Sequence, residues 1–420
     1  MHVWLSSVLV TAGFFCATAI AVSSTNSSGF VASDGSLSFA LNVPQDNGSD
    51  ELYFSLVGDS SCSWLAFGMG SQKMKDSLTF MVYSDASGKN VTVSPRLVYD
   101  HSEPTYTNNV TITVLPGTKI DGNTTTLNAK CSNCRAWKGG SVDPTNTAAN
   151  LIFATGPSGN LNTNSLTADI KRHASYGVFQ MDLTKSVGAA GVPNITTSNS
   201  AGVKELKDQA DHDVSAPLHA CLMIIAFVGL MPLGVLILRV LNSPKWHGIN
   251  QTLSFLLALI GAFLGLSVGT MYNRTKGFNT AHQIIGIIVI MMMIGQFVLG
   301  FMHHRMYKKT QAPTKLSPYH IWLGRVVIPA GIINGFLGFP LALVPKYDFA
   351  LLALVLLLII VLLPFAFWRY RRNIQKAKTV NSNSVTGYQS RPWENQTAQN
   401  DINLNQMNYP PHYGKQGYGR

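Results

Sequence analysis

Residues 217–272 read PLHACLMIIAFVGLMPLGVLILRVLNSPKWHGINQTLSFLLALIGAFLGLSVGTMY, and the two apolar runs in this stretch decide the fold. Each run has about 20 apolar residues, which as a helix rising about 1.5 Å per residue cover a hydrocarbon core of roughly 30 Å. The predicted helices lie at about residues 217–240, 247–272, 281–303, 319–344 and 349–368. We therefore expect an all-α transmembrane bundle of five helices within residues 216–370.

Four of these helices carry a histidine near their first residue, namely His219, His247, His282 and His320. Successive spanning helices run in opposite directions, so His219 and His282 share one membrane face and His247 and His320 share the other. Two layers of paired imidazoles are what two bis-histidine haem irons require. Each histidine could instead be interfacial or hydrogen-bonded in a structural core. We favour haem ligation because ionisable residues are costly inside spanning helices and usually face a functional interior.

Smaller features accompany the histidines. Gly286 in HQIIG and Gly324 in HIWLG stand one turn after a predicted ligand, where a missing side chain leaves room for a flat macrocycle. Small residues also serve ordinary packing between membrane helices. Arg325 is a charge inside the fourth helix, and we expect it to pair with a haem propionate or to line a site for the reductant.

Basic residues predict the orientation of the bundle. They concentrate after the third and fifth helices, at Arg305, Lys308, Lys309, Lys315, Arg369, Arg371, Arg372, Lys376 and Lys378. By the positive-inside rule these ends are cytoplasmic, so the His219/His282 layer is the outer one and the His247/His320 layer the inner one. Much of the net charge of +11 thus reflects topology, and we expect no nucleic-acid partner.

The N-terminus supports the same orientation. Val3–Ile20 is a short apolar run followed by small residues, which predicts a signal peptide over residues 1–21. Glycosylation acceptors follow at Asn26, Asn47, Asn90, Asn109, Asn123, Asn194 and Asn273. We expect an integral protein of the plasma membrane or an endomembrane, with its N-terminal domain extracellular or lumenal and its C-terminus cytoplasmic.

Residues 22–190 are expected to form an all-β sandwich. Eight β-rich runs recur there: LSFALNV, LYFSLV, WLAFGMG, LTFMVYS, NVTVSPRLVY, VTITVLP, ANLIFATG and YGVFQMDL. Residues 191–215 are expected to be a polar linker, and residues 371–420 a disordered cytoplasmic tail. The CSNC motif favours a disulfide between Cys131 and Cys134 over a redox or zinc site.

The runs CSWLAFGMGSQKMKDSLTFMVY, NVTVSPRLVYDHSEPTY, CSNCRAW and RHASYGVFQMDL resemble the fungal DOMON domain, a relative of the cytochrome domain of cellobiose dehydrogenases. The four histidines and YHIWLGR resemble the cytochrome b561 ferric-reductase domain. The resemblance implies a third haem b in the sandwich, held by Met74 and His173. Met81 is then expected to be a core residue, whereas Met69 could be a core residue or a competing ligand. The sandwich could instead bind sugar or nothing.

The expected function is electron transfer across the membrane. The resemblance implies a small cytoplasmic donor such as ascorbate and an extracellular acceptor, either ferric chelate or a redox protein, as in a transmembrane ferric or monodehydroascorbate reductase. The chain lacks the longer ascorbate-contact motif of animal and plant members, and no nucleotide-binding motif stands out. A carbohydrate-binding, adhesion or sensor protein with a haem-free sandwich is one alternative. A small-molecule transporter is another, although no inverted repeat or broken helix favours it.

Overall fold

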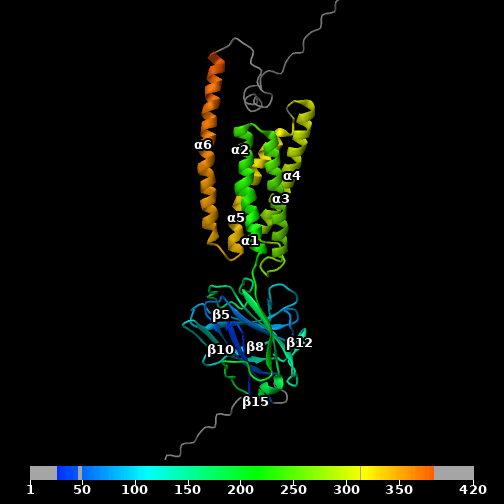
Figure 1. Ribbon diagram of the computed structural model, residues 1–420, viewed down its shortest axis with the longest axis vertical. Coiled ribbons are helices and arrows are strands. Elements are labelled where there is room, and N and C mark those ends of the chain that lie inside the picture. The colour runs from blue at the N-terminus through cyan, green and yellow to red at the C-terminus, as the bar shows by residue number, and fades with distance from the viewer. Residues whose placement is uncertain (1–25, 46–49, 313, 383–420) are drawn as a thin grey trace, which may run out of the picture. The chain divides into compact units, whose positions relative to one another are not determined.

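The computed structural model describes residues 26–45, 50–312 and 314–382. The chain divides into two compact units, Met1–His212 and Asp213–Arg420, with strands in the first and long helices in the second (Figure 1). The fold class predicted above is therefore confirmed. The predicted signal peptide lies outside the described residues, as does the part of the predicted tail beyond residue 382.

The first unit is a sandwich of two sheets, ordered β1-β2-β3-β10-β8 and β16-β14-β13-β4-β5-β6-β7, with β15 beside β2 and β9 beside β10. The longer strands are β2 Leu37–Pro44, β3 Leu52–Asp59, β4 Leu65–Met69, β5 Leu78–Ser84, β6 Val91–Leu97, β10 Thr124–Ser132, β13 Ala149–Thr155, β14 Ser175–Met181 and β16 Val203–Ala210. The shorter ones are β1 Ser28–Val31, β7 Thr105–Tyr106, β8 Thr111–Val114, β9 Lys119–Asp121, β11 Ala136–Trp137, β12 Gly140–Ser141 and β15 Val187–Gly188, with a 3-10 helix at Leu183–Ser186.

Buried phenylalanines join the two sheets. Phe39 of the first sheet lies 4.3 Å from Phe67 of the second, measured between ring centroids. Phe54 of the first sheet contacts Phe67 and Phe80 of the second at 4.9 and 5.2 Å. Burying one such ring contributes roughly 1.5–3 kcal/mol by transfer alone, so this row of aromatic side chains is a main source of stability in the sandwich.

All eight predicted strand runs are strands, but the predicted linker is partly wrong. Residues 203–210 form β16, which pairs with β14 along the edge of the second sheet. Its sequence, VKELKDQA, is charged and mostly faces solvent, so it does not look like a core strand. Charged side chains suit an edge strand, because they discourage pairing with another chain. The sandwich therefore extends to His212.

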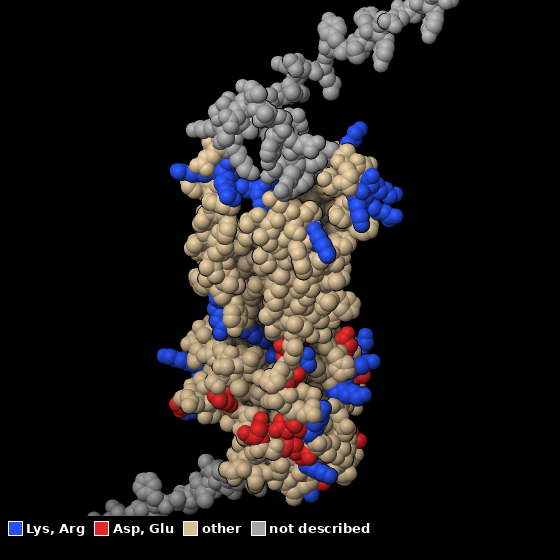
Figure 2. All heavy atoms as spheres, turned by 45° about the horizontal axis from the view of Figure 1, so that its top comes forward, with Lys and Arg blue, Asp and Glu red and all other residues tan. Residues whose placement is uncertain are grey.

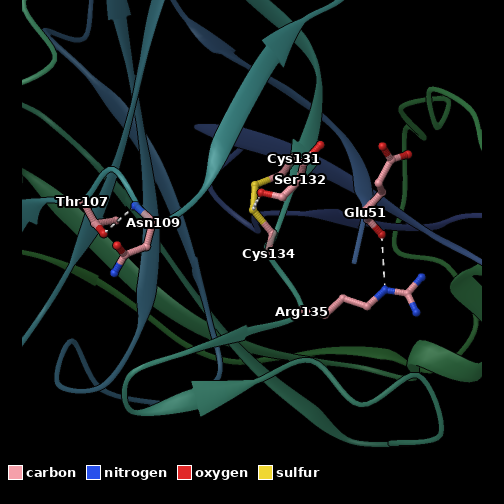
Figure 3. Close-up of a disulfide and its surroundings, with 7 residues drawn as sticks. All are labelled: Glu51, Thr107, Asn109, Cys131, Ser132, Cys134 and Arg135. Carbon is pink, nitrogen blue, oxygen red and sulfur yellow. Dashed lines mark hydrogen bonds between the residues drawn. A yellow bond between two sulfur atoms is a disulfide. The ribbon is translucent and has the colours of Figure 1, made fainter. Parts of the chain in front are cut away.

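Cys131 and Cys134 form the predicted disulfide at the end of β10 (Figure 3). The next residue, Arg135, donates from Nε to the carbonyl oxygen of Glu51 at 3.3 Å, as the figure shows, and this bond ties the disulfide loop to the start of β3. Cys62 is free and half-buried.

The second unit has five helices long and apolar enough to span a membrane. They are α1 Ser215–Ile224 continuing through a π-helix, Ile225–Leu230, into α2 Met231–Leu241; α3 Pro244–Gly269; α4 Ala281–Thr310; α5 Ser317–Leu341; and α6 Tyr347–Ser382. The helix predicted to end near residue 368 thus continues through residues expected in the tail. Many apolar side chains face outward, for example Phe263, Met291 and Ile360, which are 72%, 63% and 65% exposed.

Figure 2 shows Lys and Arg side chains near the ends of the helices, with a broad band of uncharged side chains between them on the face drawn. Many of the exposed side chains of these helices are large and apolar, far more than soluble monomers expose in one patch. Together with the helix lengths, this apolar surface identifies the second unit as an integral membrane domain.

The π-helix changes how the first span contacts α3. Its wider turns interrupt the regular ladder of helical hydrogen bonds, so nearby carbonyl groups need other donors. Asn250 donates to the carbonyl oxygen of Leu230 at 2.6 Å, and Gln251 donates to that of Met231 at 3.0 Å. The turn of α3 that follows His247 is thereby fixed against the first span.

Candidate haem sites

Each of the four predicted haem-ligand histidines has its Nδ1 next to a backbone carbonyl oxygen of another helix. His219 Nδ1 lies 2.7 Å from the oxygen of Gly261, and His247 Nδ1 lies 2.7 Å from that of Gly234. His282 Nδ1 lies 3.0 Å from the oxygen of Asn334. His320 Nδ1 lies 3.2 Å from that of Gln296. A carbonyl oxygen only accepts, so Nδ1 carries the hydrogen in all four rings. In the neutral form of each ring Nε2 then has a lone pair for a metal.

This is the arrangement of a metal-ligating histidine. Such a residue usually donates its second ring N–H to a carbonyl or carboxylate, which sets the tautomer and the ring orientation. The same partner also raises the basicity of the ligating nitrogen. A histidine with a purely structural role has no need to keep Nε2 free, and here all four rings share the pattern.

The structure brings the predicted outer pair together. The ring centroids of His219 and His282 are 6.1 Å apart. A metal–nitrogen bond of about 2 Å on each side, plus about 1 Å from each nitrogen to its ring centre, gives a separation of roughly 6 Å for two imidazoles on one metal. His247 and His320 also lie close enough to interact electrostatically. The pairing of His219 with His282 that the alternating helix directions predict is therefore present in the structure.

Glycines on the neighbouring helices make room for three of the rings. A Cβ on Gly265 would lie 2.6 Å from His219 Cε1, and one on Gly300 would lie 2.8 Å from His320 Cε1. On Gly338 it would lie 3.0 Å from His282 Cε1. Each of these glycines stands four residues after the residue whose carbonyl holds the same ring. Sequence reasoning missed them because their role depends on contacts between helices.

The two glycines predicted to border the macrocycle lie next to amide side chains. A Cβ on Gly286 would lie 3.1 Å from Asn334 Nδ2, and one on Gly324 would lie 2.8 Å from Gln296 Nε2. Their open space is thus filled by amide side chains of the facing helix. These contacts place polar side chains against both glycines, and their predicted place beside the macrocycle stays a prediction.

Arg325 is exposed, and its guanidinium stacks 4.7 Å from the ring centre of Trp322, one turn earlier in α5. It interacts electrostatically with Arg239 of α2, which also senses Arg369 of α6. Arg239 of α2 therefore has two guanidinium groups from other helices, Arg325 and Arg369, within electrostatic range. Such a cluster favours an anion, because its members otherwise only repel one another.

In the sandwich, His173 has a carboxylate beside it. His173 Nδ1 lies 2.9 Å from Asp211 Oδ2, close enough for an ion pair although not with the angles of a regular hydrogen bond. Arg172 holds the same carboxylate through both oxygens, at 2.6 and 3.0 Å. Burial lowers the pKa of His173, and Asp211 partly offsets that effect. A neutral imidazole is the form that binds a metal.

Hydrogen bonds pin the segment before His173 over the second sheet. Tyr83 donates to the oxygen of Ser165 at 2.5 Å, and Arg96 donates to that of Ala168 at 2.7 Å. Ile170 joins the apolar cluster on that face, together with Trp64 and Met81. This cluster confirms Met81 as a core residue. Met69 is buried in the main core, so of the two roles left open for it the structure favours the core role.

Met74 and His173 approach the sheet from opposite ends of β4. His173 lies two residues before β14, and Ser175 pairs through Thr155 with Leu65, the first residue of β4. Met74 lies five residues beyond Met69, the last residue of β4, and is half-buried. A common iron would need both side chains to reach along the sheet toward each other.

Comparison with known proteins supports both halves of this arrangement. Residues 16–190 match the family model of the cytochrome domain of cellobiose dehydrogenase, and residues 201–305 match that of a domain of unknown function (DUF2427). A cytochrome b561 and DOMON domain-containing protein of Arabidopsis thaliana is 26% identical over 178 residues, which are 41% of this chain and 39% of that protein's length. The chain thus matches well under half of this relative.

Two solved structures are similar at low identity. The cytochrome b domain of pyranose dehydrogenase from Coprinopsis cinerea is 20% identical, with a TM-score of 0.36, over 38% of this chain and 83% of that chain. The cytochrome domain of Myriococcum thermophilum cellobiose dehydrogenase is 15% identical, with a TM-score of 0.32, over 40% and 92%. The family match and the Arabidopsis relative support a DOMON plus cytochrome b561 architecture for this chain.

Proposed function

We propose that this protein carries electrons across a membrane through haem b, from a small cytoplasmic donor to an extracellular acceptor. The observation that carries the proposal is the set of four imidazoles, each with Nδ1 bound to a carbonyl of another helix and Nε2 free. His219 and His282 would hold the outer haem iron, and His247 and His320 the inner one.

When bound, the haems supply the one-electron chemistry, and the chain sets their ligation, spacing and surroundings. Asn334, at the level of His282, follows His320 by fourteen residues on the same helix. Fourteen residues correspond to about 21 Å along a helix, so the two layers stand near opposite faces of a core of roughly 30 Å. The macrocycles themselves would fill part of that gap.

The arginine cluster supports an anionic donor on the inner side. Arg239 lies within electrostatic range of Arg325 and of Arg369. Arg239 and Arg369 lie near the span ends that the positive-inside rule assigns to the cytoplasm. A small anion of the ascorbate type fits this charge. The same cluster could hold the propionates of the inner haem, and the two roles are compatible.

On the other side we propose that the sandwich faces the extracellular space or a lumen and binds a third haem b between Met74 and His173. The acidic partner of His173 and the match to a cytochrome domain support this ligand set. The acceptor would be a ferric chelate or a redox protein. Asn90, Asn109, Asn123 and Asn194 are exposed and suited to carry glycans, whereas Asn273 is half-buried.

The test is a reduced-minus-oxidised visible spectrum of the purified full-length protein with its haem-to-protein ratio. We expect near three haems per chain, all low-spin. A ratio near two would mean that the sandwich binds no haem and that electron transfer uses only the two haems in the membrane. A colourless protein that stays colourless after haem addition would overturn electron transfer, and a carbohydrate-binding or sensor role would then stand.

A further inference from the structure

Helices α4 and α5 repeat one pattern of residues. HQIIG at 282–286 is followed by QFVLG at 296–300, and HIWLG at 320–324 is followed by NGFLG at 334–338. In both helices fourteen residues separate the histidine from an amide residue, and a glycine stands four residues after each. The repeat places Gln296 and Asn334 at equivalent positions.

The two helices use this repeat reciprocally. The carbonyl of Asn334 on α5 holds His282 of α4, while the Asn334 side chain covers Gly286, one turn after that histidine. In the same way the carbonyl of Gln296 on α4 holds His320 of α5, while its side chain covers Gly324. Each amide residue therefore contacts one histidine-bearing turn twice, once through its backbone and once through its side chain.

Helix packing alone does not explain these amides. Asn334 is 8% exposed, and neither its Oδ1 nor Gln296 Oε1 makes a hydrogen bond of regular geometry among the described residues. Asn334 also interacts through its side chain with His282. A buried amide oxygen without a regular hydrogen bond is costly, and a leucine would fill similar space without that penalty. The contacts with the histidine-bearing turns are what the amides add.

We propose that Asn334 and Gln296 are positioning residues, Asn334 for the outer haem ligand His282 and Gln296 for the inner ligand His320. The Asn334 side chain lies against Gly286 and the Gln296 side chain against Gly324, each on the facing helix. This contact fixes the position of the amide residue's own backbone carbonyl, which accepts the hydrogen of the histidine Nδ1. That bond sets the tautomer, direction and basicity of the ligand, so each amide tunes one haem and not the other. The assignment rests on the proposed function.

The test uses full-length protein in two backgrounds, His247→Ala, which leaves only the outer haem, and His219→Ala, which leaves only the inner one. In the outer-only background Asn334→Leu should weaken haem retention roughly 10- to 100-fold, the usual effect of removing an outer-shell partner, and shift the midpoint potential. Gln296→Leu should leave that haem unchanged. In the inner-only background Gln296→Leu should weaken haem retention and shift the midpoint potential, and Asn334→Leu should leave the haem unchanged. Retention is measured as haem loss to apomyoglobin.

Ser254→Ala is the matched control, because Ser254 is a fully buried polar residue that bonds only within its own helix, to the oxygen of Asn250. It should alter neither haem. Asn334→Gln and Gln296→Asn should restore part of the lost retention. Effects of equal size in both backgrounds, or none in either, would overturn this assignment alone. A parent chain without haem would overturn the proposed function and this assignment with it.

Discussion

Each candidate ligand is held by a neighbour that is distant in the sequence. His219 takes its carbonyl from α3 and His282 takes its carbonyl from α5. The two rings nevertheless meet across the bundle, because α1 and α4 run in the same direction and begin at the same membrane face. This pairing leads to a direct mutational test.

His282→Ala should remove the same haem as His219→Ala, because one axial ligand cannot hold a low-spin bis-histidine iron. The inner haem should keep its spectrum. Visible and EPR spectra of the two single variants and of the double variant check this, and the double variant should resemble either single one. Loss of the haem that depends on His247 would mean that the pairing is wrong.

Gly265→Ala should displace the ring of His219, because the new Cβ would stand 2.6 Å from its Cε1. We expect loss of the outer haem with little loss of helix stability, since alanine is favoured over glycine in a helix by about 1 kcal/mol. Haem stoichiometry together with thermal unfolding measures both effects. Gly295→Ala is the control, because its nearest neighbour, Leu323 Cδ2, is at an ordinary 3.9 Å; an equal haem loss there would argue against a specific fit.

Among the elements, β16 changes where the sandwich ends. It pairs along most of β14, and Asp211 just after it holds both Arg172 and His173. Because β16 completes the sheet and positions Asp211 beside the predicted haem ligand His173, it is part of the sandwich domain and not of a linker.

A secreted fragment of residues 22–212 should therefore unfold at a higher temperature than one of residues 22–200. We expect a difference of at least about 4 °C, because each 1 kcal/mol shifts the midpoint by roughly 2–4 °C at this size. Differential scanning calorimetry measures it. In the longer fragment Leu206→Ala should change little, since Leu206 is 41% exposed. Equal midpoints for the two fragments would show that β16 adds nothing to the domain.

For the chain as a whole, the number of haems and their sides of the membrane decide its role. The secreted fragment 22–212 should be red, and Met74→Ala or His173→Ala should turn its iron high-spin or release the haem. Met69→Ala and Met81→Ala serve as controls, because truncating a buried methionine costs about 2–5 kcal/mol of stability without touching the iron. A folded but colourless fragment, still colourless with added haem, would rule out the third haem.

Topology is testable through the exposed Lys276 of the α3–α4 loop. A membrane-impermeant maleimide should label Lys276→Cys in intact cells, whereas Lys308→Cys should react only after permeabilisation. The unmodified parent sets the background from its own cysteines. The reverse pattern of labelling would invert the proposed direction of the bundle.

The amino-acid sequence alone determined the architecture, the strands with apolar alternation, the spanning helices and the two histidine layers. These features follow from local composition and from the alternation of helix direction, both of which are readable along the chain. The disulfide followed from the spacing of Cys131 and Cys134. By contrast, β10 and β16 were missed because polar side chains on their outward faces hide the pairing that defines them.

Only the tertiary structure decided what holds the histidines. The carbonyl of Asn334 lies fifty-two residues from His282, and Gly265 lies forty-six from His219, so no local pattern links them. The repeat of histidine, glycine, amide and glycine in α4 and α5 was visible in the sequence. The role of this repeat was not visible, because the two helices contact each other reciprocally only when they pack antiparallel with each amide residue at the level of the other helix's histidine.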